Sequence, residues 1–263
     1  MKFKWDPKDY KESSSVQYKF AQGLIAKLNL KGNEKILDIG SGDGRISAEI
    51  SQLLTKGYVV GIDNSDEMVK FSRDTYPKVN FHNLYFKTKE ATELNFEDEF
   101  DLVFSCSALH WVKDHQAVLR GIKRGLKQKG RGLLQMGGKG NVAGFFTAVK
   151  EVIAKEHYSK YFKNFHFPYY FYTPDDYNLW LKEAGLINKR TELIPVDMVH
   201  EGIEGFHAWI RTTGMPFTEK VPHDIRDEFI HAIIDNYSVA HPPDELNNII
   251  IKSIRLEVEF EKK

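Results

Sequence analysis

The chain has 263 residues, with 37 lysines and arginines against 37 aspartates and glutamates, so its formal net charge is zero. This balance argues against a dedicated nucleic-acid binder, and a composition of 41% hydrophobic and 28% charged residues excludes an intrinsically disordered chain. The single cysteine, Cys106, excludes an intramolecular disulfide and a cysteine-rich zinc site, and no stretch reaches the roughly 20 apolar residues of a membrane helix.

The first half of the chain alternates predicted helices with short apolar strands. The spacing of apolar residues predicts helices over 17–30, 46–54, 65–72 and 118–130, and strands over 35–40, 58–63, 79–81, 100–105 and 132–136. Strands that alternate with helices at these lengths pair in parallel through right-handed crossovers. We therefore expect an α/β fold with helices on both faces of one sheet.

The second half departs from this alternation. After a flexible glycine-rich connection, the sequence predicts a helix over 145–158, an aromatic-rich segment to Tyr172, and a helix that begins at Thr173-Pro174 and ends at Gly185. A strand over 193–196, helices within 201–245 and a long strand over 248–260 complete the chain. We expect one domain, 1–263, in which 141–172 and 201–245 are cap insertions that shape a site.

A glycine-rich loop follows the first predicted strand and precedes a helix. In Gly40-Ser41-Gly42-Asp43-Gly44 the glycines permit a positive φ and let a ligand approach the backbone. Asp63 lies 19 residues after Gly44, at the end of the next strand, where its carboxylate can accept from both hydroxyls of a ribose. The loop and this acid together predict a ribose-bearing cofactor.

Two departures from the dinucleotide fingerprint narrow the choice of cofactor. That fingerprint places its third glycine five residues after the first, and Arg45 stands there instead. Asp38, two residues before the loop, would repel a pyrophosphate but suits a ligand with an ammonium group. Both features favour S-adenosylmethionine over NAD.

The segment Ile36-Leu37-Asp38-Ile39-Gly40-Ser41-Gly42-Asp43-Gly44 resembles the first motif of the Rossmann-like S-adenosylmethionine-dependent methyltransferases. The resemblance implies a doubly wound, seven-stranded, mostly parallel sheet with an antiparallel last strand. It also implies that the loop contacts the methionine part of the cofactor and that Asp63 holds the ribose. Glu90-Ala91 stands where the family usually has Asp-Ala beside the adenine. The implied cofactor-binding residues are Asp38, Gly40, Ser41, Gly42, Asp63, Asn64, Glu90, Ala91 and Ser105.

A narrower resemblance concerns the acceptor. Leu109-His110-Trp111-Val112, after the fourth strand, is similar to a segment of the trans-aconitate and juvenile hormone acid methyltransferases, which esterify carboxylic acids. Short segments across nearly the whole chain share this likeness, among them Trp5-Asp6-Pro7 and 205–212. On this resemblance the substrate-contacting residues are Tyr10, Tyr170, Trp209 and Arg211.

The chemistry of a carboxylate acceptor selects further residues. A carboxylate is ionised at neutral pH, so its methylation requires orientation rather than a general base. Neutral donors orient it without suppressing its nucleophilicity, and the amide of Gln17 and the indole N–H of Trp111 suit this role. Arg211 would hold a second carboxylate or else extend from a helix surface. His110 is either a base for a phenol or alcohol or a packed histidine.

These observations predict an S-adenosylmethionine-dependent O-methyltransferase that acts on a small-molecule carboxylic acid in the cytoplasm. The alternatives are methylation of a phenol or an amine, and S-adenosylmethionine binding without catalysis. NAD-dependent oxidoreduction is a more distant alternative. We expect no metal, no nucleic-acid partner and no membrane segment. The sequence leaves the acceptor and the oligomeric state open.

Overall fold

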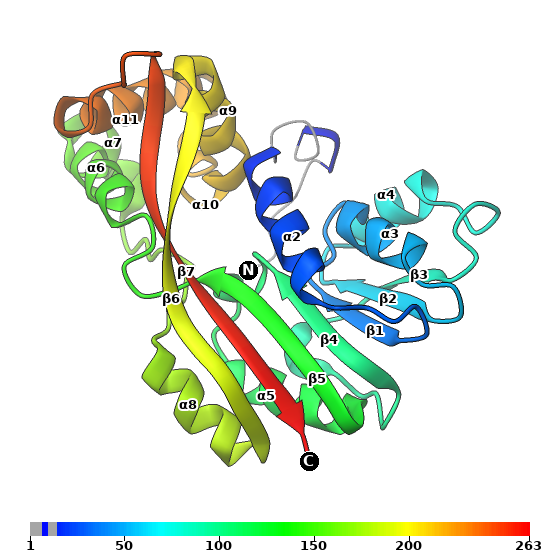
Figure 1. Cartoon of the computed structure of the whole chain (residues 1–263). Coiled ribbons are helices and arrows are strands. Elements are labelled where there is room, and N and C mark those ends of the chain that lie inside the picture. Colours follow the sequence, from blue (N-terminus) through cyan, green and yellow to red (C-terminus); the bar gives the residue numbers. More distant parts are fainter. Residues whose placement is uncertain (1–6, 10–14) are drawn as a thin grey trace.

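The computed structural model of the chain describes residues 7–9 and 15–263, except for the side chains of residues 15–17 and 19. In this part of the chain seven strands form one sheet, in the order β3-β2-β1-β4-β5-β7-β6 (Figure 1). The strands are β1 (Lys35–Ile39), β2 (Tyr58–Asp63), β3 (Leu84–Thr88), β4 (Phe100–Cys106), β5 (Leu126–Gly137), β6 (Leu186–Glu201) and β7 (Asn248–Lys262). Strands β1 to β5 pair in parallel, whereas β7 is antiparallel to both β5 and β6.

Helices cover both faces of the parallel part of the sheet. One face carries α2 (Ser15–Lys27), α3 (Arg45–Gln52) and α4 (Asp66–Thr75), and the other carries α5 (His115–Gly125) and α8 (Pro174–Glu183). Successive strand residues point to opposite faces, so Ile36 packs in the α2–α4 core while its neighbour Leu37 packs in the α5–α8 core. None of the helices in the described residues is long and apolar enough to cross a membrane.

Strands β6 and β7 continue beyond β5 as a two-stranded arm. At its far end lie α6 (Ala143–Ala154), α7 (Glu156–Ser159), α9 (Gly202–Thr213), α10 (Met215–Thr218) and α11 (Arg226–Ala240) (Figure 1). Phe145, Phe206, Phe229 and Ile251 are buried together in one apolar cluster of this part. The two segments predicted as cap insertions thus supply helices to the same cluster, and their role as a cap over a site stays a prediction.

Most predicted elements are confirmed, whereas one strand and the bounds of two other elements are corrected. The strand predicted over 79–81 is wrong, because these residues form a turn in which the Phe81 N–H donates to the Pro77 carbonyl at 3.0 Å and Val79 is 86% exposed. The third strand is β3 instead. The helix predicted to reach residue 130 ends at Gly125, because Leu126 already pairs with β4, and the sixth strand is far longer than 193–196.

Candidate functional site

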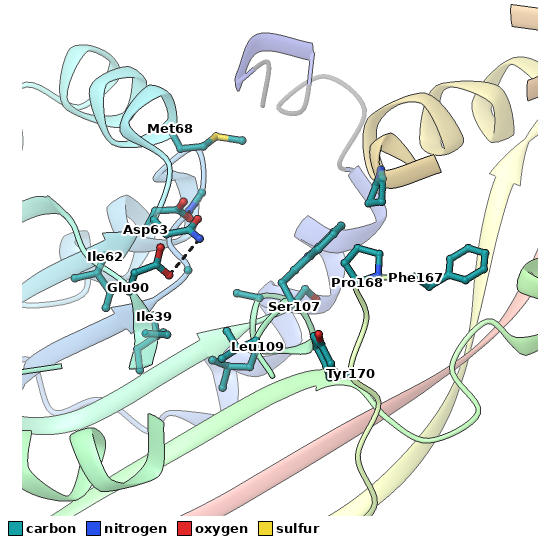
Figure 2. A pocket seen from close by; sticks show the side chains of 18 of the residues that line it. Ile39, Ile62, Asp63, Met68, Glu90, Ser107, Leu109, Phe167, Pro168 and Tyr170 are labelled. Carbon is teal, nitrogen blue, oxygen red and sulfur yellow. Dashed lines mark hydrogen bonds between the residues drawn. The ribbon is translucent and has the colours of Figure 1, made fainter. Parts of the chain in front are cut away.

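A cavity of about 520 Å³ lies where the parallel strands of the sheet end (Figure 2). Strands β1, β2, β3 and β4 all run toward this edge, so the loops that follow them meet around one space. The predicted site residues that line the cavity are Gly40, Gly42, Asp63, Asn64, Glu90, Ala91, Trp111 and Tyr170. The parallel sheet therefore brings together residues that are up to 130 positions apart in sequence.

The glycine loop closes the carboxyl end of β1 against β2. Gly40 and Ser41 donate their backbone N–H groups to the Ile62 carbonyl at 2.8 and 2.9 Å. Gly40 has a φ of +77°, and a Cβ there would lie 2.1 Å from the Cβ of Ala108. Gly42 also has a positive φ, and its N–H donates to Asp63 at 3.0 Å. Without side chains at Gly40 and Gly42, the loop packs closely on the turn after β4 and presents its backbone to the cavity; we call this stretch of backbone the glycine cradle.

Two carboxylates form one wall of the cavity (Figure 2). Asp63 accepts from the backbone N–H of Gly42 at one oxygen and of Ser65 at the other, which fixes its orientation. Burial raises the pKa of Asp63, and these backbone donors oppose that shift. The Asn64 side-chain amide donates to Glu90 across 3.4 Å. The wall therefore presents oriented acceptors to ligand hydroxyl or amino groups.

Three other predicted cofactor residues, Asp38, Ser41 and Ser105, are buried and do not line the cavity. Asp38 is 2% exposed and accepts from the Ser47 hydroxyl at 2.5 Å, and burial raises its pKa to about 7. Ser105 is fully buried and donates to the Ile39 carbonyl at 2.7 Å, so it links β4 to β1. The Ser41 hydroxyl is buried and has no hydrogen-bond partner among the described residues.

The opposite wall comes from the residues after β4 and from the aromatic segment. Residues 109–111 form a short 3₁₀ helix, and the Tyr170 N–H donates to the His110 carbonyl at 2.8 Å, which fastens the aromatic segment to this turn. Several lining residues were not predicted from the sequence, namely Met68, Ser107, Leu109, Phe167 and Pro168 (Figure 2). The position of Ser107 directly after the carboxyl end of β4 is a signal that would have found it, whereas Met68, Phe167 and Pro168 depend on tertiary packing.

A second cavity of about 90 Å³ shares Ser107 and Trp111 with the first. It holds His110 and Trp209, two further predicted site residues. Arg211 lines neither cavity. It is exposed on α9 and pairs with Asp9 at 2.5 Å, so of the two predicted alternatives the structure shows the arginine that extends from a helix surface. Tyr10 and the side chain of Gln17 lie outside the described residues, and their roles stay predictions.

The first cavity fits S-adenosylmethionine. The glycine cradle lines the cavity without a side chain, so a ligand can approach its backbone, and Asp63 and Glu90 offer oriented acceptors on the wall beside it. Asp38 adds an acidic group below the loop, which suits a cationic ligand. Because no third glycine follows at the dinucleotide spacing, the same loop is less suited to a pyrophosphate.

Comparison with known proteins agrees with this fit. Residues 30–184, more than half of the chain, match the family model described as a methyltransferase domain. An uncharacterized methyltransferase, C70.08c, of Schizosaccharomyces pombe is 32% identical over 69% of this chain and 70% of its own length. Trans-aconitate 2-methyltransferase of Methylobacterium nodulans is 23% identical over 96% of both chains. Juvenile hormone acid O-methyltransferase of Drosophila melanogaster is 26% identical over 78% of this chain and 71% of its own length.

Solved structures share the fold at low sequence identity. Phosphoethanolamine N-methyltransferase 2 of Haemonchus contortus in complex with S-adenosyl-L-methionine superimposes with a TM-score of 0.62 and 18% identity. That match covers 97% of this chain and 56% of the other. This likeness confirms the predicted Rossmann-like fold, and the family match together with the cavity confirms the predicted cofactor. The chain is therefore an enzyme of the S-adenosylmethionine-dependent methyltransferase family.

Proposed function

We propose that the protein methylates a small-molecule carboxylic acid on oxygen. The observation that carries this proposal is the position of Trp111, which lines both the cofactor cavity and the second cavity beside it. An acceptor in the second cavity would thus meet the cofactor beside Trp111. Two relatives, a trans-aconitate and a juvenile hormone acid methyltransferase, are named for acidic acceptors, which supports the same substrate class.

The protein's own residues would bind and orient both reactants. When bound, S-adenosylmethionine supplies an electrophilic methyl group on a positively charged sulfur. Gly40, Gly42, Asp63 and Glu90 would hold it in the first cavity. Trp111, and Gln17 if its side chain reaches the cavity, would donate to the acceptor carboxylate and aim one oxygen at the methyl group. Alignment of this kind lowers a barrier by about 7–11 kcal/mol.

Exclusion of water is the second contribution of the site. The ring centres of Trp111 and Tyr169 lie 4.7 Å apart, and Tyr169 stacks on Phe171 with ring centres 5.9 Å apart. These rings surround the acceptor side with apolar surface, which strengthens the electrostatic interactions of a bound carboxylate. A catalytic base is not required, since a carboxylate has no proton to lose at neutral pH.

The proposal is tested with a library of carboxylic acids, phenols and amines and a methyl-labelled cofactor. We expect label in base-labile esters of one or more acids. Trp111→Phe keeps the ring and removes the N–H. Since a hydrogen bond to a charged group stabilises by about 1.5–3 kcal/mol, kcat/KM should fall roughly 10- to 100-fold. Trp180→Phe, on α8 and outside both cavities, is the matched control.

Label in amines or phenols alone would refute a carboxylate acceptor. Equal kinetics of the Trp111→Phe variant and the parent enzyme would refute the role of Trp111 while leaving the acceptor class intact. Gln17→Ala tests the second donor in the same assay. The predicted cytoplasmic location is a separate expectation, which localisation of a tagged chain would test.

A further inference from the structure

The second cavity has walls of aromatic rings. Phe146 lies 5.2 Å from Tyr169, and Phe145 lies 5.0 Å from Trp209, both measured between ring centres. The Tyr169 hydroxyl donates to the Thr213 carbonyl at 3.0 Å, so its polar atom is held by the protein. The other aromatic residues that line the cavity are His110, Trp111, Phe171 and Phe217. These walls suit a small apolar body.

The polar side chains at this cavity are oriented as donors. Asn141 is 8% exposed, and its carbonyl oxygen accepts from the Ser253 hydroxyl at 2.7 Å and from the Ile254 N–H at 3.0 Å. These two contacts fix the direction of the amide and leave its NH₂ group as the part that can meet a ligand. A buried amide oriented in this way offers a hydrogen bond to an anion.

His110 is oriented in the same sense. Its Nδ1 faces the backbone N–H of Gly137 at 3.4 Å and can only accept there. A neutral imidazole that accepts at one nitrogen carries its proton on the other. Nε2 of His110 is therefore a donor.

Arg255 adds a positive charge to the lining. Its side chain is 5% exposed, and its guanidinium lies 4.9 Å from the ring centre of Phe20 and 3.7 Å from the sulfur of Met198. A guanidinium has five N–H donors and no acceptor. In contrast, no aspartate or glutamate of the described residues lines this cavity. The described part of the lining thus carries a cation and several donors and no side-chain anion.

Two lining residues have a strained backbone. Val142 has a φ of +46° and Ser107 a φ of +59°, in the left-handed region that non-glycine residues seldom adopt. The strain is largest in principle for Val142, because its side chain is β-branched. Such strain persists where the surrounding structure holds it, and it gathers at ligand sites. Val142 directly follows Asn141, and Ser107 precedes His110 by three residues, so each strained residue lies beside one of the proposed donors in sequence.

We propose that the second cavity is the acceptor-binding site and that Asn141, His110 and Arg255 select an acceptor with a carboxylate over a neutral or cationic one. This inference rests on the proposed function, which gives the reaction as methyl transfer to a carboxylic acid. It adds the residues that select that class of acceptor. The aromatic rings contact the apolar part of the acid, while the donors bind its oxygens. Among the lining residues that the structure describes, an amine acceptor would meet a guanidinium and no carboxylate.

Binding measurements test the proposal without reliance on turnover. Butyrate, butyramide and butylamine are titrated calorimetrically into the protein saturated with S-adenosylhomocysteine. We expect butyrate to bind most tightly and butylamine least. Arg255→Gln should weaken butyrate binding roughly 10- to 100-fold. Arg120→Gln, at an exposed position of α5, is the matched control and should change it less than twofold.

Asn141→Asp gives a second, sharper variant. An aspartate keeps the acceptor oxygen for Ser253 and Ile254, so the loop keeps its structural contacts, but it replaces the donor with a negative charge. We expect the preference to shift from butyrate toward butylamine. The affinity for S-adenosylhomocysteine should stay unchanged in each variant, which shows that the fold and the first cavity are intact.

Equal binding of the three ligands to the unmodified protein, or unchanged butyrate affinity in both Arg255→Gln and Asn141→Asp, would overturn the proposal. Its failure is separable from that of the proposed function. If acids are methylated but the variants bind and turn them over normally, only the assignment of the second cavity is wrong. If the variants lose butyrate affinity but no acid is methylated, the carboxylate site stands and the reaction is wrong.

Discussion

Gly137 donates its backbone N–H to Nδ1 of His110 across 3.4 Å. The contact ties the 3₁₀ turn after β4 to the end of β5, and it occupies the nitrogen at which a neutral histidine would accept a proton. Burial, with smaller contributions from Arg255 and His115, lowers the pKa of His110 to about 3. His110 is therefore neutral at physiological pH, and we expect its Nε2 to donate a hydrogen bond rather than to act as a base.

The first prediction concerns the pH dependence of turnover. Above about pH 3 His110 stays neutral, so kcat/KM for the acceptor, measured at saturating S-adenosylmethionine, should be flat from about pH 6 to 8. His110→Asn should lower kcat/KM by the same factor at every pH in this range, so the shape of the pH profile should not change. A limb near pH 6.5 in the parent enzyme that vanishes in His110→Asn would show that His110 is a general base.

The second prediction concerns Asp38 and cofactor affinity. Burial raises the pKa of Asp38 to about 7, so below this pH the group is protonated and loses the charge that favours a cationic ligand. The affinity for S-adenosylmethionine should fall by up to about tenfold per pH unit below pH 7. Calorimetry at pH 5.5 to 7.5 measures this slope. Asp38→Asn should bind more weakly with a flatter profile, and Asp74→Asn, at an exposed position of α4, should resemble the parent.

The third prediction concerns the glycine cradle. At Gly40 a Cβ would meet the Cβ of Ala108 at 2.1 Å, and the φ of +77° disfavours any other residue. Gly40→Ala should weaken S-adenosylmethionine binding by at least about tenfold, because relief of the clash moves the loop or the turn after β4. Gly23→Ala is the control, because a Cβ at Gly23 in α2 meets nothing within 4 Å. Equal affinity of the two variants would contradict a cradle.

The fourth prediction concerns stability in acid. Burial lowers the pKa of His200 to about 4, against about 6.5 in the unfolded chain, so protons bind the unfolded state first as the pH falls. The free energy of unfolding should therefore fall between about pH 6.5 and 4. His115 adds to this fall, whereas Asp38, whose pKa is raised, opposes it below about pH 7.

Replacement of His200 isolates its share of this dependence. In His200→Gln the slope of unfolding free energy with pH should become shallower by up to about 1.4 kcal/mol per pH unit over this range. Urea unfolding at pH 4.5, 5.5 and 6.5 measures the slope. His82→Gln, at an exposed position, is the control. An unchanged slope in His200→Gln would mean that the pKa of His200 is the same in the native and unfolded states, which contradicts the lowered value.

Local sequence patterns predicted much of the fold. The apolar run 58–63 coincides with β2, because a buried parallel strand needs apolar side chains on both faces. Thr173 caps α8 as predicted, through contacts with a residue only three positions away. The strand over 79–81 was mistaken because these residues form a turn in which Val79 is exposed, and only the pairing of Leu84 with Val59 identifies β3.

Short segments of sequence were enough to predict the residues of the cofactor side: Gly40 and Asp63 lie at the ends of strands that the apolar pattern predicts, and the family resemblance added Glu90. Only the tertiary structure brought Asn141 and Arg255 to the cavity beside Trp111. Arg255 lies in a strand antiparallel to β5, and its distance along the chain from Trp111 carries no signal of contact. The direction of each donor depends on hydrogen bonds between distant segments, such as that of Asn141 with Ser253, which local patterns do not encode.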